Sequence, residues 1–185
     1  MNFHARQNKL RERLATTRFD GLLVSHLPNI RYLCGFTGSA GILLVQESGS
    51  VFITDVRYDT QAHEEVKGAK VVIARKALLE AVGEVLAQRK KARRKRAIAI
   101  ESEHFSVAEK KRLMKFRPAW ISLNDAPAIV EKARMVKDGE ELQLIRAAVA
   151  LGARLFDRAV EVMAPGTTEV EVAAEMELAA RRAGA

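Results

Sequence analysis

The residues of this chain that could do chemistry are few, and their spacing matches no catalytic centre. Asp59 and His63 stand one helical turn apart, so the pair could share a divalent cation if the segment is helical. The four histidines of the chain show no H-E-x-x-H spacing, and neighbouring carboxylates and histidines are common on exposed helices. We therefore expect Asp59 and His63 to be solvated surface residues, and we expect no metal site in this chain.

The sequence also offers no nucleophile beside a base. Ser25 and His26 are adjacent, and adjacent residues of a strand point to opposite faces. Cys34 is the single cysteine and has neither a cation nor a histidine next to it in sequence, so a small buried thiol is expected rather than a nucleophile. One cysteine excludes an internal disulfide bond and fits a reducing environment.

Three evenly spaced glycines are a candidate for anion binding. Gly35, Gly38 and Gly41 form a G-x-x-G-x-x-G pattern, which could let backbone N–H groups approach a phosphate. A dinucleotide-binding loop, however, lies between a strand and a helix, and here a hairpin strand is expected to follow. The favoured interpretation is that the glycines permit positive φ angles in an irregular loop.

The segment Thr54-Asp-Val-Arg-Tyr58 is a candidate for recognition. Asp55 and Arg57 are two residues apart at the expected end of a strand, and in an extended segment they lie on the same side. Such a pair could bind a peptide terminus, but it more often fixes a strand-to-helix corner through charge-assisted hydrogen bonds. The structural role is the favoured one, and recognition stays an alternative.

Apolar periodicity and turn residues divide the first two thirds of the chain into alternating helices and strands. The expected helices are 3–19, a brief turn over 28–32, 58–66, 77–88 and 106–116. The expected strands are 22–25, 41–46, 50–54, 70–73, 97–100 and 120–123. The strands 41–46 and 50–54 flank a three-residue connection and so predict a β-hairpin. The predicted fold is therefore α/β, a mixed β-sheet flanked by helices.

Beyond residue 123 the pattern becomes purely helical. The segment Asn124-Asp-Ala-Pro127 breaks the composition, and Asp138 and Thr168 each begin a capping box that is followed by a helix. The first of these helices carries apolar residues at helical spacing on one face, namely Leu142, Ile145, Val149, Phe156, Val160 and Met163. The expected division is a domain over residues 1–123, a linker over 124–137 and a helical segment over 138–185.

Composition is that of a globular protein, with 48% hydrophobic and 29% charged residues in 185. No apolar run approaches the roughly 20 residues of a membrane span, and the start lacks a signal peptide, so the cytoplasm is the expected compartment. The net charge of +8 is concentrated in the basic run Arg89–Arg96, where seven of eight residues are Lys or Arg. Since no aromatic residue is interleaved to stack on bases, a solvated loop is favoured over nucleic-acid binding.

Three segments, Asn29–Gly41, Thr54–Tyr58 and Arg134–Glu141, resemble in order and spacing the motifs of the creatinase/prolidase/aminopeptidase P family, the pita-bread metallopeptidases. The resemblance implies a creatinase/prolidase-type N-terminal domain over residues 1–123 and the first helices of the pita-bread domain over 138–185. It implies that the full-length parent hydrolyses peptide bonds next to proline with a pair of divalent cations (Mn, Co or Zn). The metal ligands of that family lie in the carboxy-terminal domain, so this chain is expected to hold no catalytic residue and no cofactor.

The resemblance also implies partners. In related dimeric peptidases this domain lies near the active site of the second subunit, which makes six residues candidates for a substrate rim: Phe36, Thr37, Ser39, Asp55, Arg57 and Tyr58. The expected partners are a second copy of the chain, joined through residues 138–183, and a peptide substrate in the parent. The alternative is a non-catalytic pita-bread-related module that binds a protein or peptide, to which the basic run Arg89–Arg96 would attract an acidic partner.

Overall fold

The computed structural model describes residues 1–88 and 95–185 and separates into two units. Residues Asn2–Met135 form an α/β unit, and Val136–Ala185 form a helical unit. Most of the basic run Arg89–Arg96 lies outside the described residues, so the expectation of a solvated loop there stays a prediction.

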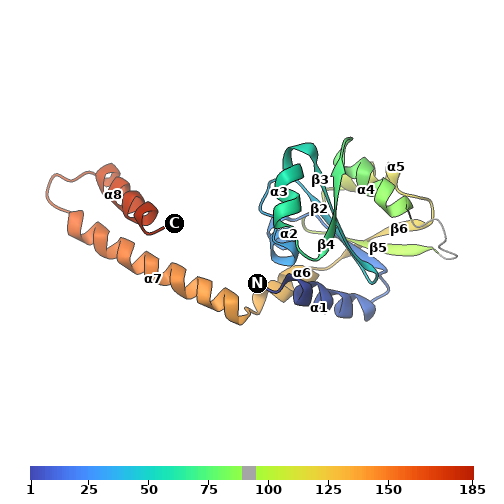
Figure 1. Ribbon diagram of the computed structural model, residues 1–185, viewed down its shortest axis with the longest axis horizontal. Coiled ribbons are helices and arrows are strands. Elements are labelled where there is room, and N and C mark those ends of the chain that lie inside the picture. Colours follow the sequence, from blue (N-terminus) through green and yellow to red (C-terminus); the bar gives the residue numbers. More distant parts are fainter. Residues whose placement is uncertain (89–94) are drawn as a thin grey trace. The chain divides into compact units, whose positions relative to one another are not determined.

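The α/β unit is built on one six-stranded sheet in the order β4-β3-β2-β1-β5-β6 (Figure 1). Its strands are β1 (Gly21–Val24), β2 (Ile42–Gln46), β3 (Gly49–Asp55), β4 (Ala69–Ala74), β5 (Arg96–Glu101) and β6 (Ile121–Ala126). Strands β2 and β3 form the predicted antiparallel hairpin, and β1 is antiparallel to β2. The pairs β3–β4, β1–β5 and β5–β6 are parallel. The predicted mixed sheet flanked by helices is confirmed.

Helices cover both faces of the sheet (Figure 1). They are α1 (Phe3–Ala15), α2 (Leu27–Cys34), α3 (Asp59–Glu65), α4 (Leu78–Ala87), α5 (Val107–Phe116) and α6 (Ile129–Met135), and a 3₁₀ turn, η1 (Val56–Tyr58), precedes α3. The alternation within β1 creates two cores, because Leu22 and Val24 join α1, α2, α3 and α6, whereas Leu23 joins α4 and α5. Every residue of β1 is buried, as expected for a central strand covered on both faces.

The segment 124–137, which the sequence predicts as a linker, holds regular structure for most of its length. Strand β6 continues to Ala126, where it pairs with Glu101, and α6 follows from Ile129. Buried Val130 anchors α6 in the core of the α/β unit, and that unit extends to Met135. The predicted end of the first domain at residue 123 is therefore wrong. The domain also includes the end of β6 and the whole of α6, and it ends at Met135.

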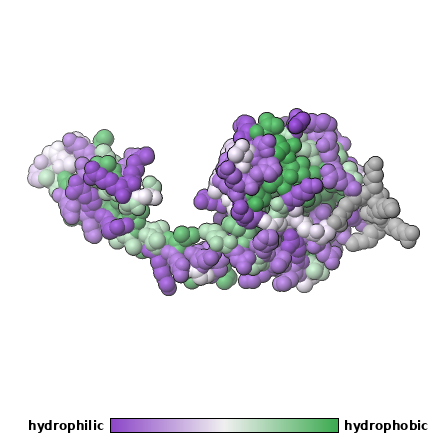
Figure 2. Space-filling model, viewed as in Figure 1, coloured by the Kyte–Doolittle hydropathy of each residue, from purple (hydrophilic) through white to green (hydrophobic). Residues whose placement is uncertain are grey.

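The helical unit contains α7 (Gly139–Val162) and α8 (Glu169–Arg182), which pack against each other. Both begin with the predicted capping boxes, and Arg158 of α7 forms an ion pair with Glu175 of α8 at 2.6 Å. The predicted apolar face of α7 is exposed at all six positions, and Figure 2 shows hydrophobic residues at the surface of this unit. Among the described helices, none is long and apolar enough to cross a bilayer.

Candidate functional site

The candidate rim residues come from two neighbouring segments of the α/β unit. The rim loop (Gly35–Gly41) joins α2 to β2, and the corner (Asp55–Tyr58) joins β3 to α3. The Thr54 hydroxyl donates to a carbonyl oxygen of the rim loop at 2.6 Å, and the hydroxyl oxygens of Ser39 and Tyr58 lie 2.6 Å apart. Two segments that are separate in the sequence thus form one patch, which we call the rim surface.

The three glycines of the rim loop are required for different reasons. Gly35 ends α2 in the left-handed region, with a φ of 87° that strains any side chain. Gly38 and Gly41 have no positive φ, but a Cβ on Gly38 would lie 2.4 Å from the ring of Phe36, and one on Gly41 would lie 2.5 Å from the ring of Phe52. The expectation of positive φ is confirmed at Gly35 and wrong at the other two, where an adjacent aromatic ring requires glycine.

Thr37 is held in place by Glu65 of α3. Its backbone N–H donates to Glu65 Oε2 at 2.7 Å and its hydroxyl donates to Oε1 at 2.8 Å, while Gln61 Nε2 donates to the Thr37 hydroxyl at 2.9 Å. Partial burial acts to raise the pKa of Glu65, but the hydrogen bonds from Thr37 and Gln61 outweigh burial, and the net pKa is lowered. An ionised Glu65 therefore fixes the outer part of the rim loop.

Asp55 and Arg57 form a bidentate ion pair at the corner. Arg57 Nε donates to Asp55 Oδ1 at 3.0 Å and Nη2 donates to Oδ2 at 2.9 Å, and the Arg57 backbone N–H also donates to Oδ1. The side-chain hydrogen bond from Arg57 lowers the pKa of Asp55. This geometry suits the corner-fixing role, and the remaining guanidinium N–H groups of exposed Arg57 can still donate to an anion in solvent.

The two aromatic candidates differ in accessibility. Phe36 is 1% exposed and packs against Phe52 at 4.6 Å and against the edge of Tyr58 at 5.5 Å between ring centroids. Phe36 is therefore a core residue beneath the rim surface. The prediction that its side chain is available to a substrate at the rim is wrong, because the ring is buried in the α/β unit. Tyr58 is half-buried, and its hydrogen bond with Ser39 lowers its pKa. Five of the six candidates remain at the surface.

The residues weighed for catalysis are not arranged for it. Asp59 and His63 are both exposed and form an ion pair at 3.1 Å on α3, and within residues 1–88 and 95–185 no three His, Cys, Asp or Glu side chains lie together as metal ligands. Cys34 is buried as predicted, and burial raises the pKa of its thiol to about 11. The rim surface can therefore bind, orient or exclude a ligand, but it offers no nucleophile and base.

A buried polar cluster, missed by sequence reasoning, lies where β1 and β5 end. Glu101 is 5% exposed and accepts hydrogen bonds from the backbone N–H groups of Ser25 and His26 at 2.7 and 2.8 Å. Asn29, which is fully buried, donates to Glu101 Oε1 at 2.7 Å and also to Glu131 of α6. Hydrogen bonds from these donors offset the cost of burying a carboxyl group in a low-dielectric interior.

The same cluster connects α6 to the sheet. Arg134 Nη1 donates to Asn29 Oδ1 at 2.8 Å, which completes the hydrogen bonding of the Asn29 amide on both sides. His104 Nε2 lies 2.9 Å from Glu131 Oε1, and its ring stacks on that of His26 with centroids 3.7 Å apart. The sequence segments that begin at Asn29 and Arg134 are thus in direct contact, although the sequence alone gives no sign of it.

Comparisons with known proteins cover both units. The sequence model of the creatinase/prolidase N-terminal domain family matches residues 6–136. The chain is 30% identical over 184 residues to the "Uncharacterized peptidase YqhT" of Bacillus subtilis (strain 168), covering 96% of this chain and 49% of that protein.

Two solved structures extend the likeness to the fold. The Xaa-Pro dipeptidase from Bacillus anthracis covers 100% of this chain and 50% of its own, with 24% identity and a TM-score of 0.86. The X-Pro aminopeptidase from Thermotoga maritima MSB8 covers 97% of this chain and 49% of its own, with 27% identity and a TM-score of 0.81. The chain therefore spans about half the length of the relatives that it matches.

Proposed function

Because this chain belongs to the creatinase/prolidase N-terminal domain family, we propose that it is the accessory and dimerisation domain of an Xaa-Pro peptidase. The observation that carries the proposal is that peptidase relatives match both units of this chain over nearly all its length. The parent would hydrolyse peptide bonds next to proline, as a dipeptidase or an aminopeptidase. Its compartment would be the cytoplasm, which suits a single buried thiol.

The divalent metal pair of such a parent does not fit the residues described here. Among residues 1–88 and 95–185 no three potential ligands lie together, so no step through a metal is assigned to this chain. The contribution of this chain would instead be steric and electrostatic. The rim surface would border the substrate entrance, with Thr37, Ser39 and Arg57 able to contact the peptide.

Assembly is the second proposed role of the chain. The apolar face of α7 is exposed at six large side chains, and full burial of such a residue stabilises by about 1.5–3 kcal/mol each. We expect this face to be covered by a second copy of the chain. Light scattering on residues 1–185 beside a version ending at Met135 tests this, and a monomer in both cases contradicts it. The double variant Val149→Glu, Phe156→Glu should dissociate the assembly, whereas Val107→Glu, at an exposed valine of α5 outside the helical unit, serves as a control.

Two observations test the peptidase role, namely the hydrolysis of an Xaa-Pro dipeptide and the coding sequence downstream of Ala185. The 185-residue chain with added Mn²⁺ should not hydrolyse an Xaa-Pro dipeptide. If the gene continues beyond Ala185 into a metal-binding domain, the longer product should hydrolyse it. Turnover by the 185-residue chain that is lost on Asp59→Asn with His63→Gln would contradict the proposal, because it would locate a catalytic centre here.

A non-catalytic peptide- or protein-binding module is the second candidate. The exposed apolar face of α7 favours it, since such faces mark interaction sites. A downstream sequence without a metal-binding set of carboxylates and histidine would support this candidate over the peptidase.

A further inference from the structure

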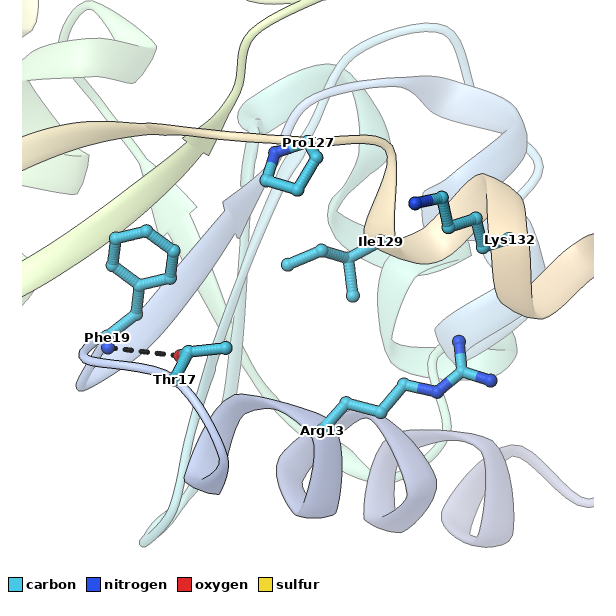
Figure 3. Close-up of a pocket in the computed structure, with 6 residues that line it drawn as sticks. All are labelled: Arg13, Thr17, Phe19, Pro127, Ile129 and Lys132. Carbon is cyan, nitrogen blue, oxygen red and sulfur yellow. Dashed lines mark hydrogen bonds between the residues drawn. The ribbon is translucent and has the colours of Figure 1, made fainter.

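A cavity of about 370 Å³ lies in the α/β unit, away from the rim surface, between the end of α1 and the start of α6 (Figure 3). It is lined by Arg13, Thr17, Phe19, Pro127, Ile129 and Lys132. Small-molecule sites usually measure about 300–1,000 Å³, so this volume suits a compact ligand. No role assigned above uses these residues.

The walls of the cavity are apolar and fixed. Phe19 and Ile129 pack against the core on the α1 face of the sheet. The Thr17 hydroxyl donates to the carbonyl oxygen of Leu14 at 2.6 Å and accepts from the backbone N–H of Phe19 at 3.1 Å. Its polar atom is thus engaged within the protein, and Figure 3 shows its methyl group turned toward the cavity. A ligand therefore meets hydrocarbon on these walls.

The two charged side chains that line the cavity, Arg13 and Lys132, are both cations. Arg13 from α1 and Lys132 from α6 lie toward the same end of the opening, opposite Phe19 (Figure 3). Within the described part of the chain, no acceptor forms a hydrogen bond or ion pair with either side chain, and no carboxylate lines the cavity.

An apolar body with one anionic end is the ligand chemistry that matches both features. A guanidinium fork binds a carboxylate in a bidentate way, and a neighbouring ammonium adds charge-assisted donors. A phosphate group would suit the cations equally, but a nucleotide or sugar phosphate would bury its polar hydroxyls against hydrocarbon walls, which is unfavourable. A neutral apolar ligand would make no use of Arg13 and Lys132, which are exposed and hydrated at the opening.

We propose that this cavity binds a monocarboxylate with a compact apolar body, such as a medium-chain fatty acid or an aromatic acid. The apolar body occupies the space between Phe19, Thr17 and Ile129, and the carboxylate lies between Arg13 and Lys132. This site is independent of the proposed peptidase role, since it shares no residue with the rim surface.

The test is a titration of the 185-residue protein with octanoate, followed by calorimetry and by backbone amide NMR. We expect saturable binding with shift changes at the amides of Thr17, Phe19 and Ile129. Octan-1-ol and octylamine are the matched probes, because they keep the chain and remove or invert the charge. Both should bind about threefold to fivefold more weakly, because Arg13 and Lys132 are exposed and an exposed ion pair contributes at most about 1 kcal/mol.

Three variants complete the test. Arg13→Gln and Lys132→Gln should each weaken octanoate binding about threefold, whereas Lys111→Gln, an exposed cation on α5, should leave it unchanged. Circular dichroism verifies that each variant is folded. Equal affinity for octanoate and octan-1-ol, equal loss in the Lys111→Gln variant, or shift changes elsewhere than at the cavity would each overturn the proposal.

Discussion

The α/β unit contains two polar assemblies that differ in burial and therefore in what they can do. At the centre of the buried cluster, Asn29 and Glu101 have almost no contact with solvent, and both form hydrogen bonds within the protein. The rim surface, with the Asp55–Arg57 pair and the Thr37–Glu65 contact, faces water. Breaking a buried charged network costs about 3–5 kcal/mol, whereas an exposed ion pair is worth about 0–1 kcal/mol. The first assembly determines stability, and the second is available for recognition.

The sharpest test of this contrast is Asn29→Ala. The substitution removes the donor to Glu101 and Glu131 and the acceptor of Arg134, so we expect a loss of about 3 kcal/mol in the free energy of unfolding. Urea denaturation measures it. Asn8→Ala, at an exposed asparagine of α1, is the matched control and should change stability by less than about 0.5 kcal/mol. Similar losses in both variants would show that Asn29 contributes no more to stability than an exposed asparagine does.

A smaller effect is expected where the rim surface touches the core. Gly38→Ala would bring a Cβ to 2.4 Å from Phe36 and 2.8 Å from the Tyr58 ring, so we expect an overpacking cost of about 1–3 kcal/mol. Gly152→Ala in α7 meets nothing within 4 Å and should stabilise its helix by about 1 kcal/mol. Thermal unfolding of both variants checks the pair. A neutral Gly38→Ala would mean that the rim loop is free to move away from Phe36.

The His26–His104 stack predicts a modest pH dependence. Burial, followed by the neighbouring charge of His104, lowers the pKa of His26 below its ordinary value. A histidine whose folded pKa is lowered stabilises the fold above about pH 6.5, and this stabilisation is lost as the pH falls through the lowered folded pKa. Unfolding curves of the wild type and His26→Gln between pH 8 and pH 4 should therefore converge at the acidic end. A constant difference across this range would contradict the assignment.

The smallest effect on stability is expected at Arg57. Because this side chain is exposed, Arg57→Gln should leave the midpoint of thermal unfolding unchanged. In the full-length parent the same variant should raise KM with kcat unchanged, the signature of lost binding to the substrate. Lys70→Gln, an exposed cation on β4, is the control. An unchanged KM would leave the Asp55–Arg57 pair with the corner-fixing role alone.

The sequence predicts the local structure of this chain well. The hairpin and the capping boxes at Asp138 and Thr168 are signals carried by residues within a few positions of each other, and all are present in the structure. Local composition also explains why the sequence predicts the end of the α/β unit at residue 123, too early in the chain. Strand β6 is an edge strand and carries Asn124 and Asp125, so its composition resembles that of a linker.

The buried cluster could not have been predicted in this way. Its bonds join Asn29 to Glu101 and Glu131 across 72 and 102 positions, and no local pattern encodes such pairings. The same limit applies to Gly41, because the ring that requires glycine there belongs to Phe52 on another segment and leaves no mark on the residues next to Gly41. In the sequence, Asn29 follows Pro28 at the start of a helix, and this alone gives only weak grounds for predicting a buried polar cluster.

The central position of β1 has a consequence for synthesis of the chain on the ribosome. Strand β1 is made early, but its parallel neighbour β5 starts only at Arg96. Until then one side of Leu22, Leu23 and Val24 presents unpaired backbone groups on an apolar strand, a template for association with other nascent chains. Expression fragments that end before Glu101 should therefore aggregate, and a fragment that extends to Met135 is the shortest that retains the whole sheet and its α6 anchor.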